Sequence, residues 1–179
     1  MFNYNVMNPS VEQMLYENPL TKFSIYTDIQ VRIINQLGTK ICTTISDWKD
    51  VTSGIDAATF DEAYGNFWLW VLGAFEIART MDQSRTSFVD SLHEPMAKIK
   101  RRLAQLRTPF AKQKLTSRKE IYTELSVVNF DGTGLKFKVD GETIDAVPLI
   151  KDVATFFKGI SSDMILEEMP VASTERVVE

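Results

Sequence analysis

The stretch YGNFWLWVLGAFEIARTMDQ, residues Tyr64–Gln83, holds two of the three tryptophans of this 179-residue chain. Its longest run of apolar residues and glycine, Phe67–Phe75, ends at Glu76. Nine helical residues rise only about 13 Å, against roughly 30 Å of hydrocarbon in a bilayer, so a membrane span is not expected. At 100° per residue, Glu76 and Arg79 fall opposite one broad apolar arc, which predicts a core helix. That arc comprises Phe60, Tyr64, Phe67, Trp70, Val71, Ala74, Phe75, Ala78 and Met81.

Two further helices are predicted, at about residues 21–46 and 88–115, on either side of this core helix. Pro95 suits the first turn of the later one. Short connections between the three helices favour antiparallel neighbours. The expected core side of the earlier helix is Phe23, Tyr26, Ile33, Ile34, Leu37, Ile41 and Ile45. The expected stripe of the later helix is Phe88, Leu92, Met96, Ile99, Leu103, Leu106 and Phe110.

The periodicity changes after Lys119. The segments IYTELSVVNF and LKFKVD read as strands on either side of the turn DGTG, and ETI after Asp140 reads as a further short strand. The segment VPLIKDVATFFKG then reads as a helix with Pro148 near its start and Gly159 just past its end. The predicted fold is therefore mainly α: three long helices in an antiparallel bundle, a small C-terminal β-hairpin and a closing helix.

Four regions are expected along the chain: an N-terminal lead-in (1–20), the helical bundle (21–115), the hairpin and helix packed on it (120–160), and a mobile acidic tail (161–179). Cys42 is the only cysteine, so no intrachain disulfide can form. The first residues lack the basic and apolar regions of a secretory signal. A cytoplasmic protein is expected.

Motifs for catalysis and for cofactor binding are sparse in this sequence. The one cysteine and the one histidine lie far apart, and neither Glu-x-x-His nor Gly-x-Ser-x-Gly occurs. The glycines of DGTGLKF lie between strand-like segments and not at a helix start, so a hairpin turn is favoured over a phosphate-binding loop. No metal or cofactor is expected. A magnesium site made of carboxylates alone stays open, although no spacing points to one.

Basic residues gather in one segment. Nine of the 20 Lys and Arg residues lie between Pro95 and Lys119 without one acid, which leaves 11 basic and 24 acidic residues, a net charge of −13, elsewhere. The segment is either a solvated face that complements those acids or a surface for RNA or an acidic partner. The nine are Lys98, Lys100, Arg101, Arg102, Arg107, Lys112, Lys114, Arg118 and Lys119.

Glu76 and Arg79 also have two interpretations. Their i, i+3 spacing is typical of a surface ion pair worth a few tenths of a kcal/mol. Alternatively, a partner could cover the pair, because Gly65 and Gly73 on the same arc would let another backbone approach closely. This face is therefore a candidate site for a homodimer or another protein.

The segment RTSFVDSLH, Arg85–His93, resembles helical domains of the HEPN type, in which an arginine precedes a histidine at the start of a late helix. The usual interval is four to six residues, and here it is seven. The resemblance covers about residues 21–115 and implies a metal-independent ribonuclease or RNA-binding protein of a toxin–antitoxin or defence system. It would assign phosphate orientation to Arg85 and acid–base work to His93.

Two functions are therefore carried forward. The first is a non-enzymatic interaction or regulatory protein. The alternative is the HEPN-like RNA-binding protein or ribonuclease. Whether the chain is an enzyme stays open, and the scarcity of catalytic motifs favours a protein that is not one.

Overall fold

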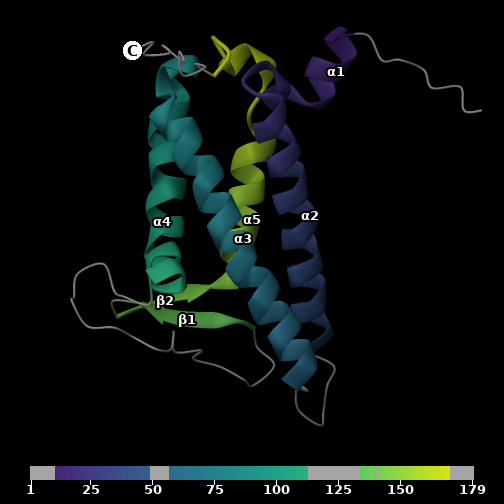
Figure 1. Ribbon diagram of the computed structural model, residues 1–179, viewed down its shortest axis with the longest axis vertical. Coiled ribbons are helices and arrows are strands. Elements are labelled where there is room, and N and C mark those ends of the chain that lie inside the picture. Colours follow the sequence, from purple (N-terminus) through teal and green to yellow (C-terminus); the bar gives the residue numbers. More distant parts are fainter. Residues whose placement is uncertain (1–10, 49–56, 113–133, 140, 170–179) are drawn as a thin grey trace, which may run out of the picture.

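The computed structural model describes residues 11–48, 57–112, 134–139 and 141–169. Three long helices pack antiparallel, and a hairpin and a fifth helix complete the bundle (Figure 1). This confirms the predicted fold class. The named elements are α1 (Val11–Glu17), α2 (Ile25–Asp47), α3 (Ala57–Gln83), α4 (His93–Lys112), β1 (Lys136–Val139), β2 (Glu142–Asp145) and α5 (Ala146–Lys158).

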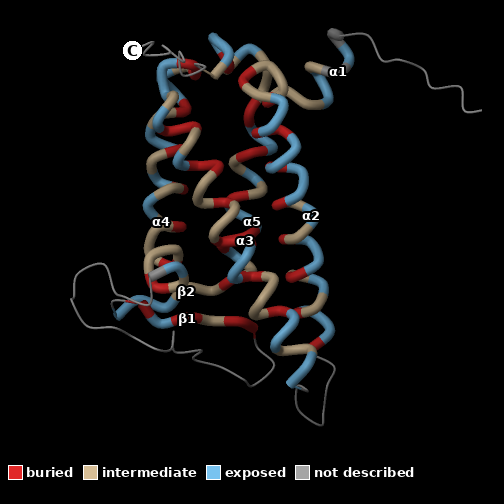
Figure 2. The backbone as a smooth tube through the Cα atoms, in the orientation of Figure 1, coloured by how far each residue is buried: buried red, intermediate tan, exposed pale blue. Residues whose placement is uncertain are grey.

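Helix α3 is the central scaffold, as predicted. Phe67, Trp70, Val71 and Ala74 are each at most 1% exposed, and the helix packs against both α2 and α4. The buried residues line the inside of the bundle in Figure 2. No helix in the described part of the chain is both long and apolar enough to cross a bilayer.

The predicted stripe of α4 is likewise buried from Phe88 to Leu106. The helix begins at His93, after two short 3₁₀ turns, and Pro95 lies in its first turn, where a missing N–H costs nothing. Pro109 lies in the last turn, and α4 ends three residues later at Lys112. The Trp68 Nε1 donates to the Phe110 carbonyl at 3.3 Å and satisfies one of the acceptors that a helix end leaves free.

Helix α2 is rotated relative to the prediction. Its core side holds Val31, Ile34, Ile41 and Ile45, with Asp28 buried beside them. Ile33 and Tyr26, which the sequence placed in the core, are 55% and 74% exposed. That part of the prediction is wrong. The helix carries apolar residues on two opposite arcs, and periodicity alone does not say which arc faces the bundle.

Glycine lets α2 and α5 approach closely. A Cβ on Gly38 would lie 2.8 Å from the Ile150 Cγ2 and 3.1 Å from the Trp70 Nε1. Those distances are below normal carbon contacts, so only glycine fits without a shift of α5 or of the Trp70 ring. Gly38, which weakens the helical pattern of α2, is thus the residue that lets Ile150 and Trp70 pack against this helix.

The hairpin is formed by β1 and β2, which pair antiparallel across a turn in which Gly141 has φ +87. Phe137 on β1 is fully buried, with its ring centroid 5.1 Å from that of Phe67 and 5.5 Å from that of Phe110. These aromatic contacts anchor the hairpin on the bundle. The strand predicted for IYTELSVVNF lies outside the described residues. The strand that pairs with β1 is the short segment predicted after Asp140.

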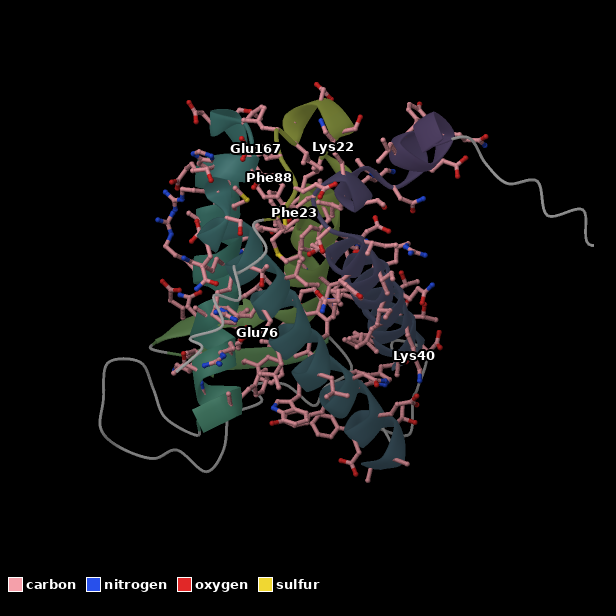
Figure 3. The ribbon with its side chains drawn as sticks, turned by 45° about the horizontal axis from the view of Figure 1, so that its top comes forward. Lys22, Phe23, Lys40, Glu76, Phe88 and Glu167 are labelled. Carbon is pink, nitrogen blue, oxygen red and sulfur yellow. The ribbon has the colours of Figure 1, made fainter. Side chains whose placement is uncertain are left out.

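Residues 161–169, named here the strap, cross the end of the bundle where α2 begins. The Leu166 amide donates to the Ser87 carbonyl at 2.8 Å, and the Met169 amide donates to the Phe23 carbonyl at 2.8 Å. The Lys22 ammonium donates to the carbonyls of Ser162 and Ile165. Lys22, Phe23 and Phe88 lie together at this end in Figure 3. The sequence predicts a mobile tail from residue 161, and residues 170–179 of that tail lie outside the described residues.

Candidate functional site

Glu76 on α3 pairs with two arginines, Arg79 on the same helix and Arg107 on α4. Its carboxylate lies 2.7 Å from the guanidinium of Arg79 and 3.5 Å from that of Arg107. Arg107 also lies over the ring of Phe75, 5.2 Å from its centroid. Glu76 and Arg79 are 45% and 44% exposed, so their pair contributes at most about 1 kcal/mol. The arrangement matches the surface ion pair predicted from the i, i+3 spacing and adds a link between two helices.

Asp82 forms a second ionic cluster nearer the end of α3. Its side chain is only 7% exposed, and it accepts hydrogen bonds from Lys100 on α4 and, at 2.7 Å, from Arg85. Burial alone would raise the pKa of this carboxyl. The hydrogen bonds and positive charges of Lys100 and Arg85 outweigh burial and hold the pKa below its ordinary value. Two of the predicted site residues, Arg85 and Lys100, therefore meet at an acid that the sequence did not single out.

His93 is the first residue of α4. Its Nε2 lies 2.8 Å from the Arg85 carbonyl and 3.2 Å from the Phe88 carbonyl, so the protonated nitrogen donates to the main chain. Its Nδ1 lies 3.7 Å from the carboxylate of Asp90. Arg85 and His93 are therefore neighbours in the structure. The group of Arg85 that contacts the histidine ring is the main-chain carbonyl and not the guanidinium. The guanidinium of Arg85 is bound to Asp82.

Most of the described basic side chains on α4 have acidic neighbours. Arg101 pairs with Glu94 on the same helix, at 2.7 Å. Arg102 reaches Asp152 on α5, also at 2.7 Å. Lys98 is exposed and has no ion pair among the described residues. The basic run thus largely complements acids from α3, α4 and α5. The side chains of Lys112, Lys114, Arg118 and Lys119 lie outside the described set.

The two glycines predicted to admit a partner helix differ. A Cβ on Gly73 would lie 2.6 Å from the Ile34 Cδ1, so Gly73 makes room for α2 of the same chain. A Cβ on Gly65 would meet nothing within 4 Å. Close approach at Gly73 is therefore already used inside the bundle.

Four of the eight large hydrophobic side chains that are exposed in the described part of the chain lie on α2, and the sequence did not predict this surface. Ile25, Tyr26, Ile29 and Ile33 are 55%, 74%, 39% and 55% exposed. At 100° per residue they share one arc of about 100°, opposite the buried side of the helix. We name these four residues the α2 outer face. Helix α2 forms one edge of the bundle in Figure 1, and its outward side is coloured as exposed in Figure 2.

A shallow groove adjoins this face between α2 and α3. Its volume is about 250 Å³, and Gly73 is part of its lining. The lining is mostly apolar, with one carboxylate. The residues are Gln30, Ile33, Ile34, Gly73, Glu76 and Ile77. Ile33 belongs to both the groove and the α2 outer face, so the two form one continuous surface.

A more polar groove runs along the other side of α2, against α5. One section, about 440 Å³, passes Asn35, Thr39 and Cys42. Burial raises the pKa of the Cys42 thiol, against a lowering by Lys151, with a further increase from Asp145. A thiol with a raised pKa is protonated at neutral pH and weakly nucleophilic. This groove therefore offers hydrogen-bonding groups but no activated nucleophile at Cys42.

Within the described ranges, no three His, Cys, Asp or Glu side chains gather as metal ligands. Comparison of the chain with protein-family models, curated proteins and solved structures finds no match. The surfaces of the molecule itself are therefore the basis for a functional proposal.

Proposed function

We propose that this chain is a protein-interaction module that docks a polypeptide on the α2 outer face and the adjoining groove. The observation that carries the proposal is the exposure of Ile25, Tyr26, Ile29 and Ile33 on the arc of α2 that points away from the core. A single exposed apolar residue is ordinary, but a contiguous apolar patch of a few hundred Å² is often functional.

The size of this surface supports docking. The four side chains leave on the order of 400 Å² of apolar area in water, within the range of patches that are usually functional. Removal of apolar area from water is the main driving force of association. A partner side chain placed in the groove at Gly73 would also contact Ile33 and Ile77. The surface thus offers both a ridge and an adjacent recess.

The charged side chains nearest this surface are already paired. Arg32 is bound to Asp28 at 3.0 Å, and Lys40 is bound to Glu62 at 2.6 Å. Covering the α2 outer face would not strand an isolated charge, which is the usual cost of burying a protein surface. The proposed role therefore moves from the Glu76 and Arg79 face, predicted from sequence, to the neighbouring face of α2.

A photo-crosslinking amino acid tests this function. Placed at Ile29 in cells that make the protein naturally, it should form covalent adducts with a polypeptide on irradiation. The same group at Thr155, an exposed position on α5, is the matched control and should form few. Absence of adducts at position 29, or equal yields at both positions, would remove the proposal.

A HEPN-type ribonuclease is the second candidate. The observation in its favour is the position of His93 at the start of α4, with its ring 2.8 Å from the Arg85 carbonyl. Against it, the Arg85 guanidinium is held by Asp82. Purified protein and the His93→Ala variant should be incubated with labelled RNA. Cleavage by the first and not the second supports this candidate, while intact RNA with both removes it.

A further inference from the structure

We infer that the polypeptide received by the α2 outer face is a second copy of this chain, with the two α2 helices antiparallel and Ile29 at their centre. The inference rests on the proposed function and names its partner. It follows from the spacing of the exposed residues, from the charges around them and from their area.

The spacing makes this face complementary to itself. Ile25, Ile29 and Ile33 follow one another at four-residue steps, each about 6 Å along the helix. A twofold axis through the centre at Ile29 exchanges the ends, so Ile25 of one copy lies opposite Ile33 of the other. A twofold interface uses the same patch on both subunits and so requires such symmetry. Rows of residues at i±4 are also the ridges that interdigitate in the commonest class of helix packing.

The charges around the face favour an identical partner. Arg32 and Lys40 are neutralised by Asp28 and Glu62 of the same chain. The surface therefore presents no unbalanced charge that would select a strongly acidic or basic partner, and none that would repel a second copy. The α2 outer face itself carries no charged side chain. Recognition at this face would therefore depend on apolar contact, and two copies of the chain present the same apolar residues to each other.

The area sets the expected strength. About 400 Å² of apolar surface from each copy, with a polar rim, buries roughly 1,000 Å² in total, the lower limit for a specific interface. A reversible dimer that dissociates on dilution is therefore expected. Sedimentation velocity should show monomer and dimer in exchange over a concentration series.

A charge at the centre should break the dimer. In the Ile29→Glu variant, two carboxylates meet near the axis, and dimerisation should weaken by about 100-fold or more. The exposure of Ile29 lets the monomer keep its fold, which circular dichroism checks. Thr155→Glu adds the same charge on α5 and should leave dimerisation unchanged. Equal dimerisation of both variants would overturn the inference.

Cysteine crosslinking tests the antiparallel arrangement. In a Cys42→Ser background, Ile29→Cys should form a disulfide-linked dimer, because residue 29 of each copy lies beside the axis. Ile25→Cys and Ile33→Cys should not self-link, since each lies about 12 Å along the helices from its own copy, beyond disulfide reach. An equal mixture of the Ile25→Cys and Ile33→Cys variants should form a disulfide between residue 25 of one copy and residue 33 of the other. Self-linking at all three positions would indicate parallel helices and refute the arrangement.

The proposed function and this inference fail in different ways. A photo-adduct at position 29 with an unrelated protein, and no Ile29→Cys dimer, would refute the second copy as partner and leave the interaction function standing. The absence of any photo-adduct would refute both.

Discussion

Replacement of Asp82 by asparagine should destabilise the protein at neutral pH and much less in acid. Asp82 is 7% exposed and receives hydrogen bonds from Arg85 and Lys100, which are 50% and 33% exposed. A hydrogen bond to a charged group is worth roughly 1.5–3 kcal/mol, and both cations can be rehydrated when the carboxylate is lost. The expected loss in free energy of unfolding is therefore about 2 kcal/mol, below the range for a fully buried pair.

The pH dependence follows from the direction of the pKa shift. Folding lowers the pKa of Asp82, so the contribution of this carboxylate is fully present above the pKa of the unfolded chain. It is lost as the pH falls through the lower pKa of the folded protein. Once Asp82 is protonated, the wild type resembles the Asp82→Asn variant at this position. The difference between their stabilities should therefore shrink towards zero.

Urea unfolding of both proteins near neutral pH and in acid measures this difference. The control is Glu94→Gln, which removes the ion pair of Arg101 on the same helix, where both side chains are more than 60% exposed. That variant should lose less than about 0.5 kcal/mol at any pH. The electrostatic explanation would be refuted if wild type and Asp82→Asn had the same free energy of unfolding at neutral pH. It would also be refuted if the difference between them were as large in acid as at neutral pH.

Two further predictions concern glycine and the strap. Gly38→Ala should lower the free energy of unfolding by about 1–3 kcal/mol, because its Cβ would lie 2.8 Å from Ile150. Gly65→Ala has open space around it and should stabilise α3 by up to about 1 kcal/mol. Thermal melts of the two variants measure this, and equal signs would contradict the packing argument. Lys22→Met should accelerate hydrogen exchange at the strap amides of Leu166 and Met169, because it removes the ammonium that holds two strap carbonyls. Lys158→Met, an exposed change on α5, is its control, and unchanged exchange in Lys22→Met would show that the main-chain bonds alone hold the strap.

The sequence predicts α3 well because its apolar arc is broad and only that side of the helix can face the core. Trp70 and Phe67 could not face water without exposing a large apolar area. Helix α2 has no such asymmetry. Ile33 and Ile34 are adjacent, and only the position of α3 decides that Ile34 faces inward. The error in α2 and the surface now proposed for docking thus have the same cause, a helix with apolar residues on two sides.

The candidate sites were harder to predict, because ion pairs form across long separations in sequence. Lys98 to Lys119 contains no acid, yet Lys100 binds Asp82 and Arg102 binds Asp152, 50 residues away. Segregation of charge along the chain therefore says little about its distribution in space. Local spacing was informative only where both partners lie on one helix, as with Glu76 and Arg79.

The strap has a consequence for synthesis. The Lys22 ammonium is bonded to the Ile165 carbonyl, 143 residues away, and the Phe23 carbonyl accepts from Met169. Translation runs from the amino end, so the three long helices can leave the ribosome and associate while these groups still lack their acceptor and donor. The bundle would be open at that end until the ninth residue of the strap emerges. Phe88 forms an isolated antiparallel bridge with Ile165 of the strap. A nascent chain stalled before Ser161 should therefore expose Phe88 to chaperones and proteases.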